Sequence, residues 1–522
     1  MELHKNVPAT KSWLCCTMLL FAVAAFWSAE PAQAQAGTGP SRETEPVVLT
    51  GSMFPDVAGD DISRMAAFRW DAVLESFELI RFQIDEKKVK VFWLGSPWEF
   101  SQTLYDVAGD EGGILDGDDE LVFLFQDSGP QAPAEAEWPL GTGLIRHEIA
   151  VTNPDQLSDV RWVYLFNLTG WQPPAGYVTW DASQFSDISS TLFELDYVDR
   201  WVLEGYRVNS PCGTGVDLID RVKARTGVVG NPLTETEEDW NNTAIYLGGI
   251  VGPVRAIRSV RGAASALNTF HHDIIYHSMW EREVTLRVHP IGRITLYLDW
   301  LPQPNMTYLA SNVSGGVAVD GDDDSEVSLE RPSWEIIRGS YGGLALMANP
   351  VPSPYVDEMN RYYRDDDRFD DAPDETYIDE DDSAFGNFGL QGVNFTGDES
   401  TGVVTRFRVY PLCSDTGDAA AGAGFRNLWD NPFITAVSPQ WRTLGPIRNL
   451  LNTDGPIQVT QSWPAVNGAE AYRVYASDTA DLPRESWTLL TETTGLTFTD
   501  PKDPVTRFYS VVPVSGGDEG DW

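Results

Sequence analysis

Short runs such as Trp162-Val163-Tyr164-Leu165-Phe166 recur along the first half of this chain and decide its fold class. Their side chains are aromatic, β-branched or leucine, and most of these residue types are enriched in strands. Similar runs at residues 77–84 and 121–125 are separated from one another by clusters of Gly, Pro, Asn or Asp. Strands that follow one another through turns are typical of antiparallel sandwiches. The sequence therefore predicts an all-β protein built of large antiparallel β-sandwich units.

The same pattern predicts one or two large β-sandwich units in residues 49–438, with β-rich domains expected at residues 49–205 and 206–438. One short helix is predicted over residues 217–225, because Leu218, Ile219 and Val222 share one helical face and a glycine follows. Within the second domain, residues 357–382 hold 13 acidic and 3 basic side chains. Such a run predicts an acidic loop that is either solvated or collects cations.

Residues 440–522 have a different pattern of aromatic and β-branched residues. Trp463 ends one predicted strand, Tyr472-Arg473-Val474-Tyr475 forms the next, and Phe508-Tyr509-Ser510-Val511-Val512-Pro513-Val514 follows a turn after Thr497-Phe498-Thr499-Asp500. This arrangement resembles the fibronectin type III family, which implies an immunoglobulin-like sandwich that acts as a spacer or a binding surface. The sequence departs from the family at the final strand, because only residues 516–522 remain to form it. This edge is either short or supplied by the preceding domain.

The N-terminal residues predict export from the cytoplasm. Lys5 and Lys11 precede an apolar stretch at residues 13–27, and small residues follow at 32–36. This order is that of a cleaved secretory signal peptide at residues 1–36, which a linker at residues 37–48 follows. No later stretch reaches the roughly 18 apolar residues of a membrane span. The sequence therefore predicts a secreted, periplasmic or extracellular chain without a membrane span.

Charge and cysteine content restrict the partners and the compartment. The formal net charge of −42 excludes nucleic acid and anionic membranes as partners, because both are polyanions. Cys15 and Cys16 lie in the signal peptide, so that Cys212 and Cys413 remain in an oxidising compartment. These two residues either form a disulfide or stay as two separately buried thiols.

Residues 106–120 form an acidic, glycine-rich segment that resembles the calcium loops of EF-hand and dockerin proteins. Calcium takes about six to eight oxygen ligands, and such loops place carboxylates around a sharp glycine turn. Gly113 takes the place of that glycine, and the upstream ligands match after a two-residue insertion. The alternative is an acidic hairpin turn that leads into the strand at residue 121. The resemblance implies a structural calcium ion held by Asp106, Asp110, Asp116, Asp119 and Glu120.

Residues 250–300 carry a net charge of +2 within this acidic chain, from six arginines and four carboxylates. They also hold four of the six histidines. An anionic substrate would bind most favourably at such a positive segment. The candidate substrate-binding residues are Arg255, Arg258 and Arg287.

Three interpretations of the histidines in this segment remain open. His271 or His272 as a base, with Tyr276 as a proton donor, would form the kind of pair that polysaccharide lyases on β-sandwich scaffolds use. A metal site would use His271, Asp273 and His277, but the outer pair would lie about 20 Å apart on a straight strand. In the third interpretation these are half-exposed strand residues that pair with neighbouring carboxylates.

The tryptophans suggest a glycan partner. The chain has 19 of them, and six are grouped between residues 93 and 180 of the first predicted domain. Aromatic rings stack on the apolar faces of sugars, although ordinary core packing would also account for these rings. The six are Trp93, Trp98, Trp138, Trp162, Trp171 and Trp180.

Two functions follow from the sequence, and whether the protein is an enzyme stays open. The first is a non-catalytic, calcium-stabilised extracellular protein that binds a glycan or another surface component. The second is a polysaccharide-degrading lyase or hydrolase with its site in residues 255–299. No Gly-x-Ser-x-Gly, His-Glu-x-x-His, phosphate-loop or dinucleotide motif occurs, so that those enzyme classes are poor candidates.

Overall fold

The computed structural model describes most of the chain between residues 40 and 519. The described residues are 40–93, 99–183, 187–228, 231–262, 269–287, 291–350, 356–366, 384–395, 402–413, 417–441, 450–454, 458–466, 468–479, 486–501, 507–515 and 518–519. The predicted signal peptide at residues 1–36 lies outside them, and so do residues 367–382 of the predicted acidic loop.

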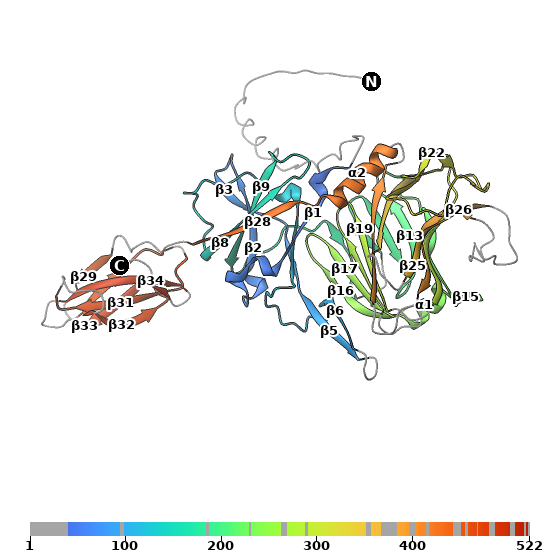
Figure 1. Cartoon of the computed structure of the whole chain (residues 1–522). Helices are drawn as coiled ribbons and strands as arrows, with labels where there is room; N and C mark the ends of the chain where they lie inside the picture. Colours follow the sequence, from blue (N-terminus) through green and yellow to red (C-terminus); the bar gives the residue numbers. More distant parts are fainter. Residues whose placement is uncertain are drawn as a thin grey trace, which may run out of the picture. The chain divides into compact units, whose positions relative to one another are not determined.

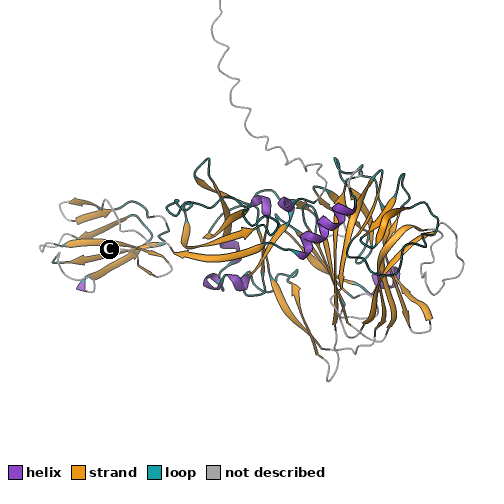
Figure 2. Cartoon of the chain, turned by 45° about the horizontal axis from the view of Figure 1, so that its top comes forward, coloured by secondary structure: helices purple, strands orange, loops and turns teal. Residues whose placement is uncertain are grey.

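Strands dominate the described chain, which confirms the predicted all-β class (Figure 2). The strand pairs in the described residues are antiparallel, as expected for strands that turns connect. No helix in this part of the chain is long and apolar enough to cross a lipid bilayer. The helices are α1 (Glu237–Thr243), α2 (Ala419–Asp430) and the 3₁₀ turns Arg42–Thr44, Gly51–Met53, Pro55–Val57, Ile62–Arg64 and Phe125–Asp127.

Two sheets form an N-terminal sandwich, with strand orders β1-β7-β4 and β28-β8-β9-β2-β3 (Figure 1). Val163 and Leu165 of β9 lie in the core between the two sheets. Because side chains alternate along a strand, Tyr164 and Phe166 lie on the outer face of the five-stranded sheet. The strands are β1 (Pro46–Thr50), β2 (Met65–Asp71), β3 (Ser76–Leu79), β4 (Gln83–Asp85), β7 (Glu120–Leu124), β8 (Thr142–Thr152), β9 (Val160–Leu168) and β28 (Ile434–Trp441).

A nine-stranded sheet of order β16-β17-β18-β19-β27-β24-β23-β21-β22 is the largest element that the structure describes. Its outer face packs against the N-terminal sandwich and α2, and its inner face packs against two smaller sheets. The late strand β27 lies between β19 and β24. The strands are β16 (Ile245–Val251), β17 (Ala256–Arg261), β18 (Phe270–Ile275), β19 (Trp280–Arg287), β21 (Thr307–Ala310), β22 (Val313–Ala318), β23 (Glu335–Gly339), β24 (Gly342–Pro350) and β27 (Gly402–Leu412).

The two smaller sheets have the orders β15-β14-β20-β26-β25 and β10-β11-β12-β13. Leu195 and Leu203 of one sheet and Leu298 and Phe388 of the other join Trp280 in the inner core. The strands are β10 (Val178–Thr179), β11 (Ile188–Ser190), β12 (Phe193–Tyr197), β13 (Leu203–Val208), β14 (Ile219–Val228), β15 (Asn231–Thr236), β20 (Ile291–Trp300), β25 (Val356–Asp366) and β26 (Ala384–Phe395). A separate hairpin joins β5 (Lys87–Trp93) to β6 (Glu99–Tyr105).

The helix predicted over residues 217–225 is wrong, because these residues enter β14, which pairs with β15 and β20. The alternation of buried and exposed side chains that is usual in a strand is absent over residues 222–227, which are all buried. Lys223 is buried and forms an ion pair with Asp299 at 2.6 Å. Arg225 is buried and paired with Glu237 in the same way. These ion pairs with residues distant in sequence therefore favour a strand, although the spacing of the apolar residues is that of a helix.

The chain crosses the expected domain limits at three points. β1 begins at Pro46, inside the expected linker of residues 37–48. The expected limit at residues 205/206 falls inside β13. β28 belongs by sequence to the expected second domain, but it pairs with β8 of the N-terminal sandwich from Ile434 to Trp441.

The C-terminal residues form two facing sheets of strand orders β29-β30-β33 and β32-β31-β34-β35. Trp463, Tyr472, Val474 and Val511 make their shared core. The fibronectin type III resemblance stays a prediction. The strands are β29 (Leu451–Asp454), β30 (Gln458–Ser462), β31 (Ala471–Ser477), β32 (Thr488–Thr493), β33 (Thr497–Pro501), β34 (Phe508–Ser515) and β35 (Asp518–Glu519).

A disulfide joins Cys212 to Cys413, as the first interpretation of the two cysteines predicts. The two residues are 201 positions apart in the sequence. The bond therefore closes a long loop, which restricts the unfolded chain.

We expect loss of this disulfide to lower the free energy of unfolding by about 3–5 kcal/mol. The physical reason is the greater conformational freedom of the unfolded chain. Thermal melting of the wild type and of a Cys212→Ser/Cys413→Ser variant, each with and without reductant, measures the effect. Reductant should not shift the variant further, and an unchanged melting temperature in the variant would contradict the prediction.

Candidate functional site

The predicted acid–base residues are divided between the two faces of strand β18. His271 pairs in register with Val260 and His272 with Ser259, so the side chains of the two histidines project to opposite faces of the nine-stranded sheet. His271 contacts the indole of Trp201 on the inner face. His272 contacts Tyr105 of β6 on the outer face. One substrate therefore cannot reach both histidines at once.

On the inner face, the carboxylate of Asp273 is buried among cations and an indole. Arg282 Nε lies 2.6 Å from Asp273 Oδ1, and Trp280 Nε1 donates to the same oxygen at 3.0 Å. Arg258 Nη1 lies 3.9 Å from Oδ2. Burial by itself would raise the pKa of Asp273, but Arg282 and Arg258 outweigh it and lower the pKa. Asp273 is therefore a buried anion that holds two guanidinium groups in place.

His271 belongs to this inner cluster and remains neutral. It is 1% exposed, and the indole N–H of Trp201 lies 3.3 Å from its Nε2. Burial, followed by the charge of Arg282, lowers its pKa to about 3. A side chain with so low a pKa and no access to solvent is a poor general base.

On the outer face, Arg255 is the centre of a second buried network. Its guanidinium lies 2.7 Å from Asp85 and 2.8 Å from Glu120, and it donates to the hydroxyl of Tyr276 at 2.8 Å. Lys87 forms a further ion pair with Glu120 at 2.8 Å. Asp85 and Glu120 come from the N-terminal sandwich, so this network joins the sandwich to the nine-stranded sheet.

His272 and Tyr276 share the outer face, but both are buried. His272 Nδ1 lies 2.8 Å from the hydroxyl of Ser259. Burial lowers the pKa of His272 to about 4 and raises that of Tyr276 to about 12. Tyr276 is 4% exposed and its hydroxyl already accepts from Arg255. The interpretation of these residues as half-exposed is therefore wrong, because both faces of β18 are covered.

The three candidate arginines do not form one anion site. Arg255 and Arg258 are each 1% exposed and belong to the networks on opposite faces of the sheet. Arg287 is the last residue of β19, opposite Gly402, and its side chain lies outside the described residues. The alternation along β17 and β18 was readable from the sequence, whereas the distant partners Asp85 and Tyr197 were not.

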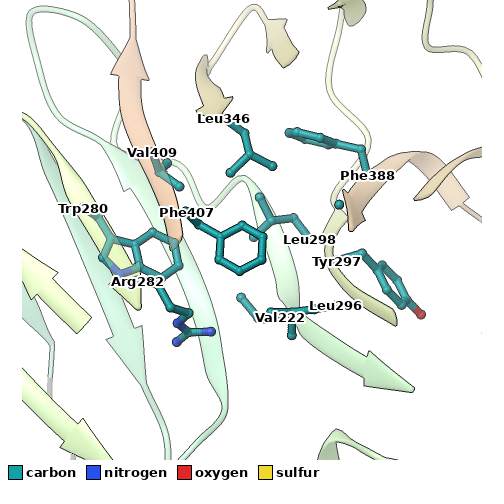
Figure 3. A pocket seen from close by; sticks show the side chains of 11 residues that line it. Val222, Trp280, Arg282, Leu296, Tyr297, Leu298, Leu346, Phe388, Phe407 and Val409 are labelled. Carbon is teal, nitrogen blue, oxygen red and sulfur yellow. The ribbon is translucent and has the colours of Figure 1, made fainter. Parts of the chain in front are cut away.

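A cavity lies between the nine-stranded sheet and the sheet of order β15-β14-β20-β26-β25, beside the inner cluster (Figure 3). Its volume is ≈ 40 Å³, whereas ligand pockets measure roughly 300–1,000 Å³. Apolar side chains make up most of its wall, and Arg282 lies at one side. As it stands, this space is a packing cavity. Its lining includes Val222, Trp280, Arg282, Leu298, Phe388 and Phe407.

The predicted calcium ligands form separate groups, each satisfied by protein donors. Asp106 and Asp110 both contact the ammonium group of Lys88. Burial by itself would raise the pKa of Asp106, but the hydrogen bond from Lys88 outweighs burial and the pKa falls to about 2. Asp119 accepts from the backbone N–H groups of Lys87 and Asp116. Within the described ranges, no group of three or more His, Cys, Asp or Glu side chains is placed to hold a metal ion.

Aromatic side chains gather on the outer face of the N-terminal sheet β28-β8-β9-β2-β3. We call this group the aromatic face, and its residues are Trp70, Phe77, Trp138, Trp162, Tyr164 and Phe166. Trp138 and Trp162 are half-buried. The guanidinium of Arg146 lies 5.2 Å from the centre of the Trp138 ring and 5.4 Å from that of Tyr164. Two nitrogen atoms of Arg146, Nε and Nη1, are buried without a hydrogen-bond partner. The aromatic face therefore combines rings at the surface with unsatisfied donors beneath them.

No protein-family model matches the sequence, and no curated protein matches it. Solved structures with a similar arrangement include a putative aldose 1-epimerase from Escherichia coli K12, at 12% identity and a TM-score of 0.27, covering 44% of this chain and 99% of that chain. A family GH92 alpha-mannosidase from Bacteroides thetaiotaomicron matches at 11% identity and a TM-score of 0.25, covering 46% of this chain and 32% of the other.

A copper-containing benzylamine oxidase from Hansenula polymorpha matches at 10% identity and a TM-score of 0.25, covering 65% of this chain and 78% of that chain. Likeness at this level carries no functional argument. The proposals for this protein therefore rest on its own residues.

Replacement of Asp273 should destabilise the protein strongly, because Arg258 and Arg282 would be left buried without their anion. We expect Asp273→Asn to lower the free energy of unfolding by about 3–5 kcal/mol. Glu283→Gln is the matched control, since its partner Arg406 is half exposed, and it should cost about 1 kcal/mol or less. Urea denaturation of both variants measures the difference. Equal losses would contradict the central role of Asp273.

Calcium at residues 106–120 stays a prediction that melting experiments can test. An ion bound to the folded state raises the melting temperature, and here it would have to displace Lys88 from Asp106. We expect a higher melting temperature in calcium than in chelator, and no difference for Asp106→Asn. Asp71→Asn, at the end of β2 and outside this segment, is the control. If chelator leaves the melting temperature of the wild type unchanged, the prediction of a calcium ion at residues 106–120 is wrong.

Proposed function

We propose that this chain is an exported, non-catalytic protein that binds glycans through the aromatic face of its N-terminal sandwich. The observation that carries the proposal is the set of half-buried indoles, Trp138 and Trp162, above the buried cation Arg146. Indole rings offer the flat apolar surface on which sugar rings stack. The unpartnered nitrogens of Arg146 are donors that ligand hydroxyls can satisfy after a small movement of Trp138.

The burial of the predicted acid–base residues supports the non-catalytic part of the proposal. His271 and His272 lie on opposite faces of β18, and Tyr276 is engaged by Arg255. General acid–base catalysis needs its groups within hydrogen-bond reach of one substrate. No observation in residues 255–299 favours a polysaccharide-degrading enzyme, because the candidate side chains with described surroundings are enclosed on both faces of the sheet.

Export is the second part of the proposal, and two features support it. The first is the signal-peptide pattern of residues 1–36. The second is the disulfide between Cys212 and Cys413, a bond that persists in oxidising compartments. In this setting the fibronectin-like module at residues 440–522 would serve as a spacer or a second binding surface.

A glycan array with the full chain, followed by titration of the best ligand, tests the proposal. We expect Trp138→Ala and Trp162→Ala each to weaken binding about tenfold, or ~1.4 kcal/mol, because each removes a stacking surface. The same ligands should stay intact during prolonged incubation, since the proposed protein has no turnover.

Trp441→Ala is the matched control, because Trp441 is 68% exposed on β28 and does not belong to the aromatic face. Its affinity for the ligand should equal that of the wild type. Absence of binding to every glycan on the array would overturn the proposal, and so would equal effects of all three substitutions. Release of shortened products would overturn its non-catalytic part.

A further inference from the structure

Four polar side chains that neither the sequence analysis nor the aromatic face brings together meet at one place. They are Arg81, which precedes β4, Asp127 at the end of a 3₁₀ turn, Tyr177, which precedes β10, and His277 in the turn between β18 and β19. The guanidinium of Arg81 lies over the Tyr177 ring, 4.5 Å from its centre. The His277 ring meets the same ring edge to face at 5.1 Å. We name these four residues the junction cluster.

The hydroxyl of Tyr177 is the centre of the junction cluster. It donates to Asp127 at 2.9 Å, and it accepts from Arg81 at 3.3 Å and from Gln126 at 3.1 Å. Burial and the charge of Asp127 raise the pKa of Tyr177 to about 12. The phenol therefore remains protonated and holds its neighbours in position, so that it is a positioning group and not a base.

Arg81 is the accessible cation of the cluster. Its side chain is 34% exposed, and its ion pair with Asp127 is long, at 3.7 Å. Its Nε donates to the backbone oxygen of Ala175 at 2.6 Å, which fixes the guanidinium in place. By contrast, Arg255 and Arg258 are enclosed within the buried networks. Arg81 thus offers a fixed positive charge near solvent in a chain of net charge −42.

His277 adds a neutral donor or acceptor beside this cation. It is half-buried, and its Nδ1 is buried without a hydrogen-bond partner. Burial, followed by the charge of Arg81, lowers its pKa to about 4. Between about pH 5 and 8 the imidazole is therefore uncharged, so that Arg81 is the cation of the cluster.

Asp127 controls how strongly Arg81 attracts an anion. Burial raises the pKa of Asp127 to about 6, although the hydrogen bond from Tyr177 and the charges of Arg81 and Arg69 oppose this rise. Arg69 is itself paired with Glu78 at 2.7 Å. Above this pKa the carboxylate neutralises Arg81. Below it Asp127 is neutral, and the charge of Arg81 is free for a ligand.

We propose that the junction cluster binds the carboxylate of an acidic sugar, with Arg81 as the anion contact, and that binding strengthens as Asp127 takes up a proton. The sugar part of this inference rests on the proposed glycan-binding function. The carboxylate part rests on the partly exposed guanidinium of Arg81, which its contacts with Ala175 and Tyr177 hold in place. The site is separate from the aromatic face, since none of its four residues belongs to that face.

Calorimetric titration of the full chain with oligogalacturonate, at about pH 5 and about pH 7.5, tests this inference. The ligand stays ionised at both values, so any change in affinity arises from the protein. If binding requires protonated Asp127, the affinity should be about tenfold to thirtyfold higher at the lower pH. The methyl ester of the same oligosaccharide, which lacks the charge, should bind weakly at both.

Three variants separate the roles of the residues. Arg81→Gln should lose oligogalacturonate binding at both pH values, and Arg81→Lys, which keeps the charge, should recover part of it. Asp127→Asn should bind at the higher pH as tightly as at the lower one. Arg406→Gln is the matched control, because its side chain is 52% exposed and paired with Glu283 elsewhere on the chain, and it should bind like the wild type.

Equal binding of the acid and its ester, affinity that does not change with pH, or unchanged binding by Arg81→Gln would each overturn the inference. Melting curves of the variants identify any that fail to fold, and Arg81→Lys then provides the decisive comparison. If neutral glycans bind through Trp138 while Arg81→Gln binds oligogalacturonate like the wild type, only this inference fails. If no glycan binds at all, the proposed function fails as well.

Discussion

The carboxylate of Asp273, buried between Arg282 and Arg258, is the interaction on which the rest of the large sheet depends. Ionised groups remain in a protein interior only when their charges and hydrogen bonds are matched. That requirement fixes β17, β18 and β19 relative to one another, and the contact of Arg282 with Tyr197 brings the four-stranded sheet into the same arrangement. The arginine-rich segment at residues 250–300 is consequently an internal support of the fold.

A similar requirement holds on the other side of β18. Arg255 is satisfied only when Asp85 and Glu120 of the N-terminal sandwich lie against the nine-stranded sheet. Apolar contacts reinforce this arrangement, since Val122 and Leu124 of β7 pack with Ile257 and Ile274. The sandwich and the sheet therefore share a core, and β28 returns from residue 434 to complete the sandwich. Limits between such units are set by contacts rather than by linkers.

Period-two alternation was enough to predict the fold class, but the opposite projection of His271 and His272 was recognised only in the structure. It failed at β14, where ion pairs of Lys223 and Arg225 bury positions that would otherwise be polar and exposed. The alternation also did not distinguish arginines that are buried in ion-pair networks from arginines that solvent can reach. Exposure of an arginine depends on partners that are distant in sequence, such as Asp85 for Arg255 and Asp127 for Arg81. The junction cluster gave no sequence signal, because its members come from four separate segments.

The place of β27 has a consequence for the order in which the protein is made. It lies between β19 and β24, so the sheet exists as two groups of strands, each with an unpaired edge, until residues 402–412 have been synthesised. Exposed edges of that kind invite pairing with other chains. A nascent chain that stops before β27 would therefore be prone to aggregate. Completion of the sheet is therefore a late step of assembly. The disulfide can form only after that step, because Cys413 directly follows the last residue of β27.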